Sequence, residues 1–149
     1  MRLKKLYIGI SLFIFLLTGL TAHAAIRTVT GTVTKVSDGD TIHVTTPEHT
    51  KLKVRLYGID APETPKINKR SGRISKLGQP YGEESWKALE IKIMRKQVKL
   101  DIIDIDKYRR MVGMIWIGDR NINLEMVSEG YAEAYSDFLI DKFSENGQS

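Results

Sequence analysis

The sequence predicts a mainly β domain with helices (α+β), namely a five-stranded Greek-key barrel accompanied by about three helices. Three observations lead to this prediction. Five short segments alternate apolar and polar residues or are rich in β-branched residues, as strands are. The first three of these segments follow one another across tight turns, which favours an antiparallel meander over alternating βαβ units. Segments with apolar residues at helical spacing come only after these three strands.

The strand signals differ in clarity along the chain. Residues 26–36 place valines among threonines, and the strong turn signal Asp38-Gly39 follows. A second strand is predicted at 41–44, a turn at 47–49 and a third strand at 52–57. After the helical segment, alternation returns at 98–105, and a fifth strand at 111–117 ends at Gly118-Asp119.

Three helices are predicted from apolar spacing and from end signals. Residues 83–95 begin with acids and end with bases, as the helix dipole favours. Residues 122–129 form a short helix that Gly130 stops, and a last helical stretch is predicted at 137–143. Five strands and about three helices in one small domain fit a barrel of the oligonucleotide-binding (OB) type.

The first 24 residues predict a signal peptide. A basic start is followed by an uncharged apolar run at 6–20, and Ala22-His23-Ala24 has the small-x-small pattern of a cleavage site, here after Ala24. The alternative is a retained membrane anchor, but about 15 apolar residues fall short of the ~20 that span a bilayer. We therefore expect a secreted protein, periplasmic or extracellular, with no stable membrane anchor after cleavage.

Residues 25–149 are predicted to form one domain. They carry 20 basic and 18 acidic residues, a net charge of +2, so an argument for nucleic-acid binding has to rest on where the charges lie. The chain has no cysteine, which excludes disulfides and a lipidated N-terminal cysteine. A monomer is the default expectation for a domain of this size.

Residues 62–82 are predicted to form a long loop with a concentration of positive charge. It has no acid between Glu63 and Glu83, and five basic residues: Lys66, Lys69, Arg70, Arg73 and Lys76. Such a loop is a candidate for contacts with a phosphate backbone, which would be salt-sensitive and independent of sequence. The alternative is a solvated loop without a partner.

Two aspartates are candidate ligands for a hard metal ion. Asp40 follows the Asp38-Gly39 turn and Asp60 lies just past the third strand. With backbone carbonyls and water they would make an all-oxygen site that suits Ca²⁺ or Mg²⁺. Zinc is disfavoured because, after loss of the signal peptide, only two histidines and no cysteine remain. The alternative is a plain hairpin turn with solvated acids.

One further carboxylate and two arginines complete a candidate phosphodiesterase site. Glu63, held near a metal but free of it, could orient or deprotonate an attacking water; alternatively it caps a turn together with Thr64. Arg55 and Arg110 could each make fork-like hydrogen bonds to a phosphate. The alternative is a structural Arg55–Asp60 ion pair with a solvated Arg110.

Tyr108 and Tyr135 could stack on a base or reach a phosphate, although a single tyrosine is more often a packing residue. Trp86 and Trp116 fit core positions of a helix and a strand.

Five segments, taken in order, resemble the micrococcal (thermonuclease-type) nuclease family. They are DGDT at 38–41, VRLYGIDAPET at 54–64, GQPYGEE at 78–84, DKYRR at 106–110 and EMVSEGYA at 125–132. The resemblance extends from about residue 28 to residue 135. It implies a five-stranded OB barrel with three helices, and Ca²⁺-dependent hydrolysis of DNA and RNA that leaves 3′-phosphate ends.

The resemblance also assigns roles to residues. Those that correspond to the family's catalytic residues are Arg55, Glu63 and Arg110. One Ca²⁺ ion would be held by Asp40, Asp60 and the backbone carbonyl of Ala61. Residues that fall near the family's substrate contacts are Lys107, Tyr108 and Tyr135. One departure stands out, because Arg109 occupies a position where the family usually has glycine. A catalytically inactive OB module that binds nucleic acid or protein is the alternative function.

Overall fold

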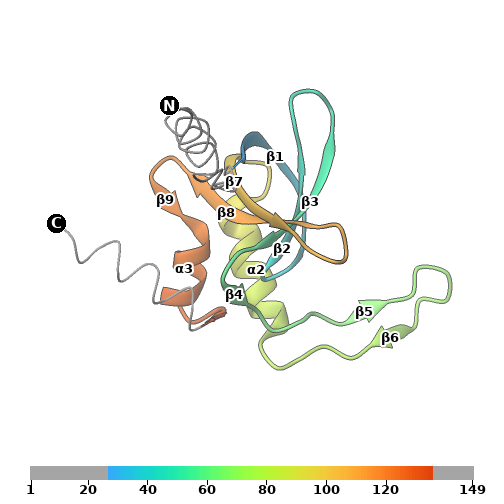
Figure 1. The fold of residues 1–149 in the computed structure, drawn as a ribbon. Coiled ribbons are helices and arrows are strands. Elements are labelled where there is room, and N and C mark those ends of the chain that lie inside the picture. Colours follow the sequence, from blue (N-terminus) through green and yellow to red (C-terminus); the bar gives the residue numbers. More distant parts are fainter. Residues whose placement is uncertain (1–26, 136–149) are drawn as a thin grey trace, which may run out of the picture.

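Five strands close into a barrel in the computed structural model, which describes residues 27–135 (Figure 1). The barrel strands are β1 (Arg27–Asp38), β2 (Thr41–Thr45), β3 (Lys51–Leu56), β7 (Gln97–Ile105) and β8 (Met111–Ile117). Antiparallel pairing runs in the order β3-β2-β1-β7-β8, and the parallel pairing of β3 with β8 closes the ring. The predicted five-stranded OB barrel is thus confirmed.

Strands β7 and β8 approach each other closely at Gly113. At Gly113 in β8, a Cβ atom would lie only 2.6 Å from the carbonyl oxygen of Asp101. The register of β7 against β8 shifts just beyond this point, between Ile102 and Asp104. A glycine lets β7 and β8 come this close. On the β3 side, the Gly113 carbonyl accepts a hydrogen bond from the Tyr57 amide at 2.8 Å, next to the Leu56–Gly113 pair that helps to close the barrel.

The core fills the barrel and the space beneath its two described helices. Alternate strand residues point inward, as the period-2 pattern predicted. The largest fully buried side chains are Ile42, Leu56, Ile59, Leu89, Ile93, Leu100, Ile115, Ile122 and Met126. Strands and helices therefore share one continuous apolar cluster, which fixes the ends of β2 and β3 where the candidate site lies.

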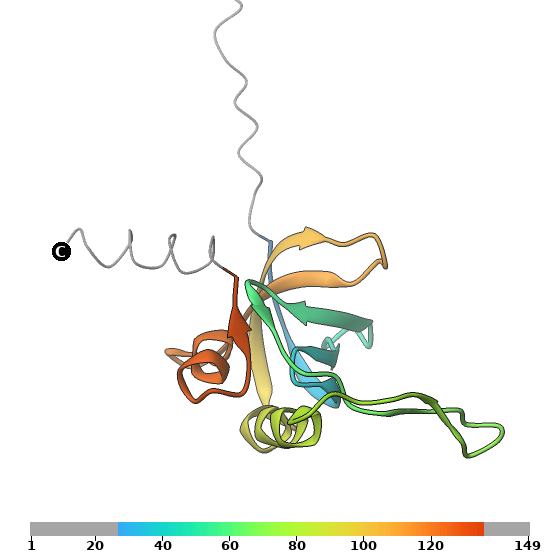
Figure 2. The ribbon, with the colours of Figure 1, turned by 90° about the horizontal axis from the view of Figure 1, so that it is seen from below.

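Helix α2 (Gly82–Ile93) packs against β1, and α3 (Ile122–Ser128) packs against β8 (Figures 1 and 2). Helix α2 ends two residues earlier than predicted because Met94 is already extended, with ψ 131°. Asn121 caps α3 by accepting a hydrogen bond from the Leu124 amide, and Gly130 has the positive φ of 80° expected after a helix. The helix predicted at 137–143 lies outside the described residues.

The prediction of one long loop at 62–82 was incomplete. Within it, β5 (Lys66–Ile67) and β6 (Ile74–Lys76) pair as a small hairpin that projects away from the barrel (Figure 2). The side chain of Asn68 holds the turn by accepting hydrogen bonds from the amides of Arg70 and Ser71. Strands of two and three residues are too short to leave a periodic signal in a sequence.

A second short ribbon brings the end of the described chain to the barrel. Strand β4 (Ile59–Asp60) pairs with β10 (Glu133–Ala134), and the Tyr135 amide that follows donates a hydrogen bond to the Gly58 carbonyl at 2.9 Å. Strand β9 (Arg120–Asn121) extends β8 by an antiparallel bridge. Across residues 27–135, no helix has the length and apolar character needed to cross a membrane. The predicted signal peptide, residues 1–24, is not among the described residues.

Candidate active site

Asp40 is buried at the point where β1 turns into β2. Only 4% of the residue is exposed, and its carboxylate accepts hydrogen bonds from the Thr41 hydroxyl at 2.8 Å and the Ala61 amide at 3.3 Å. Asp38, on the other side of the turn, accepts from the Thr64 hydroxyl and pairs with Lys66. Both acids are engaged, so this is not a plain hairpin turn with solvated carboxylates.

Gly39 allows the turn to press against its neighbours. A Cβ atom at this position would lie 1.8 Å from the Ser85 hydroxyl oxygen in α2 and 2.8 Å from the Ala61 Cβ. The Ser85 hydroxyl is itself held, because it donates to the Tyr131 carbonyl at 2.7 Å. A glycine is therefore needed between the two aspartates to bring the Asp40 carboxylate and the 60–63 segment together.

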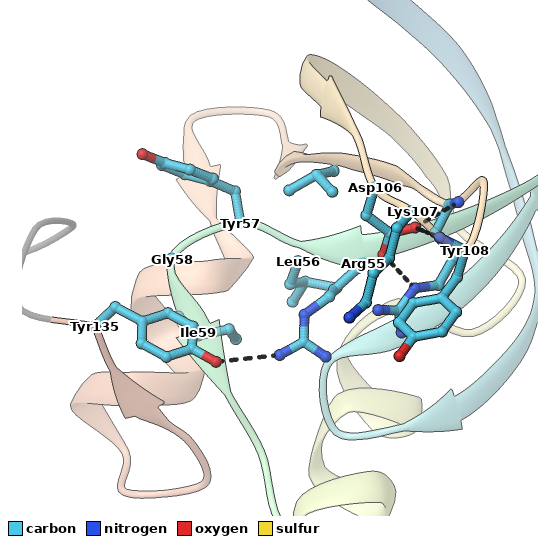
Figure 3. A pocket seen from close by; sticks show the side chains of 11 residues that line it. Arg55, Leu56, Tyr57, Gly58, Ile59, Asp106, Lys107, Tyr108 and Tyr135 are labelled. Atoms are coloured by element: carbon cyan, nitrogen blue, oxygen red, sulfur yellow. Dashed lines mark hydrogen bonds and ion pairs between the residues drawn. The ribbon is translucent and has the colours of Figure 1, made fainter.

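Arg55 joins the two aspartates that the sequence proposed as metal ligands. Its Nη1 lies 3.3 Å from Asp40 Oδ2, and its Nη2 lies 2.8 Å from Asp60 Oδ1. The Tyr135 hydroxyl is 3.5 Å from the same Nη2 (Figure 3). The position follows from strand register, since Arg55 is paired with Thr41, the neighbour of Asp40. The Arg55–Asp60 ion pair is thus present, and Arg55 also lines an open cavity.

Burial raises the pKa of Asp40. Desolvation raises the pKa of Asp40 above its ordinary value, and the nearby Asp60 charge adds to this; hydrogen bonds from Thr41 and Ala61 and the charge of Arg55 only partly oppose the rise. An additional positive charge beside Asp40 and Asp60 would oppose this rise, because it stabilises the charged form of the carboxylates. This is an environment that favours a bound cation.

The donor set at this point suits a hard cation. Among residues 27–135 no three His, Cys, Asp or Glu side chains gather as a metal-binding group. Asp40 and Asp60 nevertheless lie on either side of the Arg55 guanidinium, and the Ala61 amide donates to the Asp40 carboxylate. Two carboxylates with carbonyl and water oxygens form the kind of site that Ca²⁺ accepts, with its six to eight oxygen ligands.

Glu63 is fixed by its backbone, while its carboxylate stays partly exposed. Its amide donates to the Gln79 side chain at 2.8 Å and its carbonyl accepts from the Gln79 amide at 2.8 Å. Its side chain, 42% exposed, pairs with Lys76 of the β5–β6 hairpin. Thr64 does not cap a turn with Glu63, because its hydroxyl donates to Asp38 and the Ser37 carbonyl. An exposed ion pair of this kind is weak, so the carboxylate can be released.

Arg110 is held by the loop that precedes it. Its Nε donates to Asp106 Oδ2 at 2.7 Å, and its amide donates to Asp106 Oδ1 at 3.0 Å. Burial alone would raise the pKa of Asp106, but these bonds and one from the Tyr108 amide outweigh it and lower the pKa. The guanidinium lies 5.4 Å from the centroid of the Tyr108 ring. Arg110 is therefore an anchored side chain, 18% exposed, and not simply solvated.

Two cavities meet at Arg110. The first, about 650 Å³, is lined by Arg55, Lys107, Tyr108, Arg110 and Tyr135 among others. Figure 3 shows Arg55 between the rings of Tyr135 and Tyr108. The second, a groove of about 1150 Å³, lies under the β5–β6 hairpin and includes Glu63 and Arg110. The sequence-predicted residues thus fall into one region, in which Arg55 contacts Asp40, Asp60 and Tyr135, and Glu63 lines the groove together with Arg110.

Sequence reasoning missed the residues that hold these groups in place. Lys76 and Gln79 position Glu63, and Asp106 positions Arg110. Asp106 was visible within the DKYRR segment, but its role depends on the turn that it makes. Lys76 was visible only as one of the basic loop residues and Gln79 only as part of the GQPYGEE segment, because their contacts with Glu63 depend on how the 62–82 segment folds back onto itself.

Arg109 has a strained backbone that explains why glycine is the family's usual residue there. Its φ is 61°, in the left-handed region, and its amide closes the turn by donating to the Asp106 carbonyl at 2.9 Å. Left-handed backbone costs a non-glycine residue roughly 1–2 kcal/mol. We expect Arg109→Gly to raise the free energy of unfolding by about 0.5–1 kcal/mol, after the greater freedom of glycine in the unfolded chain is subtracted. Urea unfolding measures this, and Arg109→Ala, which keeps the strain, should give no gain.

The fold and the site together define a class of protein: an OB barrel whose edge carries two carboxylates, two arginines and a separate glutamate around an open junction. Residues 53–148 match the family model described as staphylococcal nuclease homologue. This chain belongs to that family, which confirms the resemblance drawn from its motifs.

Curated relatives agree with this assignment. A protein described as an uncharacterized endonuclease from Haemophilus influenzae is 37% identical over 109 residues, which is 73% of this chain and 54% of that protein. A thermonuclease from Staphylococcus intermedius is 35% identical over 104 residues, 68% of this chain and 57% of that protein. The probable endonuclease LCL3 of Yarrowia lipolytica is 30% identical over 148 residues, 82% of this chain and 62% of that protein. The chain thus spans little more than half the length of these relatives.

Proposed function

We propose that this protein is a secreted, Ca²⁺-dependent nuclease that hydrolyses phosphodiester bonds of DNA and RNA with little sequence specificity and leaves 3′-phosphate ends. One observation carries the proposal furthest. Arg55 contacts both Asp40 and Asp60 and lines the cavity that Arg110 also lines, which supports a cation site next to a phosphate site. The family and the names of its relatives support the same activity.

In this proposal the cation site consists of Asp40, Asp60 and the carbonyl of Ala61. A Ca²⁺ ion, when bound, would polarise a phosphoryl oxygen and offset the negative charge that develops on it. Asp40 is suited to this because its burial disfavours an uncompensated negative charge. Asp60, whose side chain is 58% exposed, leaves room for water and for a phosphate oxygen.

The chain's own residues would perform the remaining steps. Glu63 orients a water molecule and accepts its proton as the water oxygen attacks phosphorus. Arg55 and Arg110 hold the phosphate with charge-assisted hydrogen bonds that strengthen as negative charge accumulates. The P–O5′ bond then breaks, the 5′ oxygen takes a proton from solvent, and the phosphate stays on the 3′ side.

Glu63 has to leave Lys76 before it can act. Both side chains are largely exposed, at 42% and 62%, so opening this ion pair costs little. Lys76, Glu63 and Arg110 all line the groove. A negatively charged substrate entering the groove would attract Lys76 and favour release of the glutamate.

The alternative, an inactive OB module, is less well supported. Inactive members of such a fold are expected to lose one or more catalytic or metal residues. Here the candidate set is complete: Asp40, Arg55, Asp60, Glu63 and Arg110. Arg55 contacts both Asp40 and Asp60, Arg110 is anchored where the two cavities meet, and Glu63 is held by its backbone in the groove.

The experiment that tests the proposal is digestion of single-stranded DNA and of RNA by the purified protein. We expect cleavage with Ca²⁺, none with EDTA, and recovery when Ca²⁺ is added back. Products should lose a terminal phosphate to a 3′-phosphatase. A folded protein that binds DNA but cleaves nothing in Ca²⁺ would favour the inactive module, and EDTA-resistant cleavage would refute the metal site.

A further inference from the structure

The groove beneath the β5–β6 hairpin has properties that the proposed reaction does not use. Its floor is the outer face of β1, β2 and β3, its wall is the hairpin, and Trp86 of α2 closes one side. At about 1150 Å³ it is larger than the cavity beside Arg55 and Tyr108. Arg110 belongs to both, so the groove begins where the candidate scissile phosphate would lie.

Three basic side chains cross the floor of the groove in one row. Lys35 in β1 is paired in register with His43 in β2, and His43 is paired with Lys53 in β3. All three line the groove. Residues directly opposite each other on adjacent antiparallel strands lie on the same face of the sheet, so this row is a property of the barrel's register.

The positive charge of this row is not balanced within the described part of the chain. Neither Lys35 nor Lys53 forms an ion pair with any residue of 27–135, whereas Lys66 and Lys76 in the hairpin wall pair with Asp38 and Glu63. Like charges on neighbouring strands repel. Desolvation and the charges of Lys35 and Lys53 together lower the pKa of His43. An anion that enters the groove would be attracted to this unpaired row.

The groove is also apolar in part, and this restricts the class of anion that could bind there. Ile67 and Ile74 are cross-strand partners in the hairpin; they are 63% and 59% exposed and both line the groove. The Trp86 ring is fixed there by a hydrogen bond from its Nε1 to the Val36 carbonyl at 3.1 Å. A chain that presents phosphates on one side and flat apolar surfaces on the other fits such a lining, and single-stranded nucleic acid is that kind of chain.

The tip of the hairpin does not share this position. Lys69, Arg70 and Arg73 are exposed, and they line neither the groove nor the cavity. The hairpin cations that do reach the groove, Lys66 and Lys76, are already paired with acids. The unpaired charge that a polynucleotide would meet thus lies on the barrel, outside the basic segment that the sequence indicated.

We propose that the groove between the β5–β6 hairpin and the β1–β2–β3 face binds the nucleotides that flank the scissile phosphate, with Lys35 and Lys53 contacting their phosphates. The proposal rests on the proposed nuclease function. It adds that substrate is held on both sides of the junction, one side in the Tyr108 cavity and the other in the groove. Long single strands are then bound more tightly than short ones, through residues that take no part in the chemistry.

The test compares the Lys35→Gln/Lys53→Gln double variant with the unaltered protein on two substrates. One is an oligothymidylate longer than the ~4–16 nucleotides that one OB-type site covers, and the other is a dinucleotide that cannot reach along the groove. We expect KM for the long substrate to rise about tenfold. The plot of log binding constant against log salt concentration should become less steep, its slope falling in magnitude by roughly 0.7 for each phosphate that is no longer neutralised. The kcat on the long substrate and the turnover of the dinucleotide should stay unchanged.

A matched control removes the same charge elsewhere. Lys87 and Lys96 are exposed and line neither the cavity nor the groove, so Lys87→Gln/Lys96→Gln should leave KM and the salt slope as they are. Lys35→Arg/Lys53→Arg keeps the positive charges and should retain tight binding. An equal KM increase in the Lys87/Lys96 control, or unchanged values in the groove variant, would overturn the proposal.

Binding of fluorescent oligothymidylate in EDTA separates the groove from the chemistry. If the unaltered protein cleaves nothing but binds the oligonucleotide, and the groove variant binds about tenfold more weakly, the groove stands and the nuclease function fails. If the protein cleaves DNA but the groove variant binds normally, the nuclease function stands and the groove proposal fails. Displacement of the oligonucleotide by polyaspartate at equal charge concentration would also overturn the groove proposal, because such displacement would indicate that the groove binds an acidic polypeptide.

Discussion

Replacing Arg110 by alanine is expected to lower kcat by about 10² or more, the scale of losing one charged partner of a transition state. Arg110 is held by Asp106 and lies at the junction of the two cavities, so no neighbouring group can replace its charge without moving. KM should change less than kcat, because the guanidinium is expected to strengthen its interaction only as charge builds on the phosphate. Steady-state cleavage of a defined oligonucleotide in saturating Ca²⁺ measures both constants.

Two control variants test whether the loss of kcat is specific to the Arg110 guanidinium. Arg110→Lys retains the charge but not the two-pronged geometry, so it should recover only part of the lost rate. Arg120→Ala removes an equal charge at a position whose side chain pairs with Glu125 and lines neither cavity, and its kcat should be normal. Near-normal turnover by Arg110→Ala would remove Arg110 from the mechanism.

Replacing Asn123 by alanine is expected to lower the free energy of unfolding by about 3 kcal/mol, because buried polar groups lose their partners. Asn123 is fully buried. Its side-chain oxygen accepts from the Ile115 amide at 3.0 Å, and its nitrogen donates to the carbonyls of Tyr57 at 2.9 Å and Gly113 at 3.2 Å. Its side-chain hydrogen bonds therefore connect α3 to β8 and to the segment after β3, where the barrel closes.

Urea or thermal unfolding of Asn123→Ala measures this loss. Asn68→Ala is a fitting comparison, since Asn68 also accepts hydrogen bonds from backbone amides, but in the exposed hairpin turn; its cost should stay near ~0.5–1 kcal/mol. If both variants lose the same small free energy of unfolding, the buried hydrogen bonds of Asn123 do not stabilise the closed barrel as we expect.

Much of the barrel was predictable because its strands are buried on one face. The alternation at 98–105 and the valines of 26–36 record which side chains point inward, and the structure confirms both strands. Helix boundaries followed from Gly130 and from the acids before Trp86. These signals are local, so they can be recognised in a single segment without knowledge of what packs against it.

The site was predictable only as a set of residue types. That Asp40 lies against Arg55 depends on the register Thr41↔Arg55, and that Glu63 is held by Gln79 depends on the return of the 62–82 segment. The row Lys35–His43–Lys53 spans three strands, and each member alone is an ordinary surface residue. Such features are created by pairing between distant segments and leave no trace in any one of them.

The measurement that tests the central claim most directly compares Glu63→Gln with the unaltered protein in cleavage and in Ca²⁺ binding. Glu63 is assigned to the water and not to the metal, so both proteins should gain thermal stability when Ca²⁺ is added, as ligand binding to the folded state requires. Only the unaltered protein should cleave single-stranded DNA at a substantial rate, with the variant slower by about 10² or more. Equal cleavage by the two proteins would contradict the account, and so would loss of the Ca²⁺-induced stabilisation in Glu63→Gln.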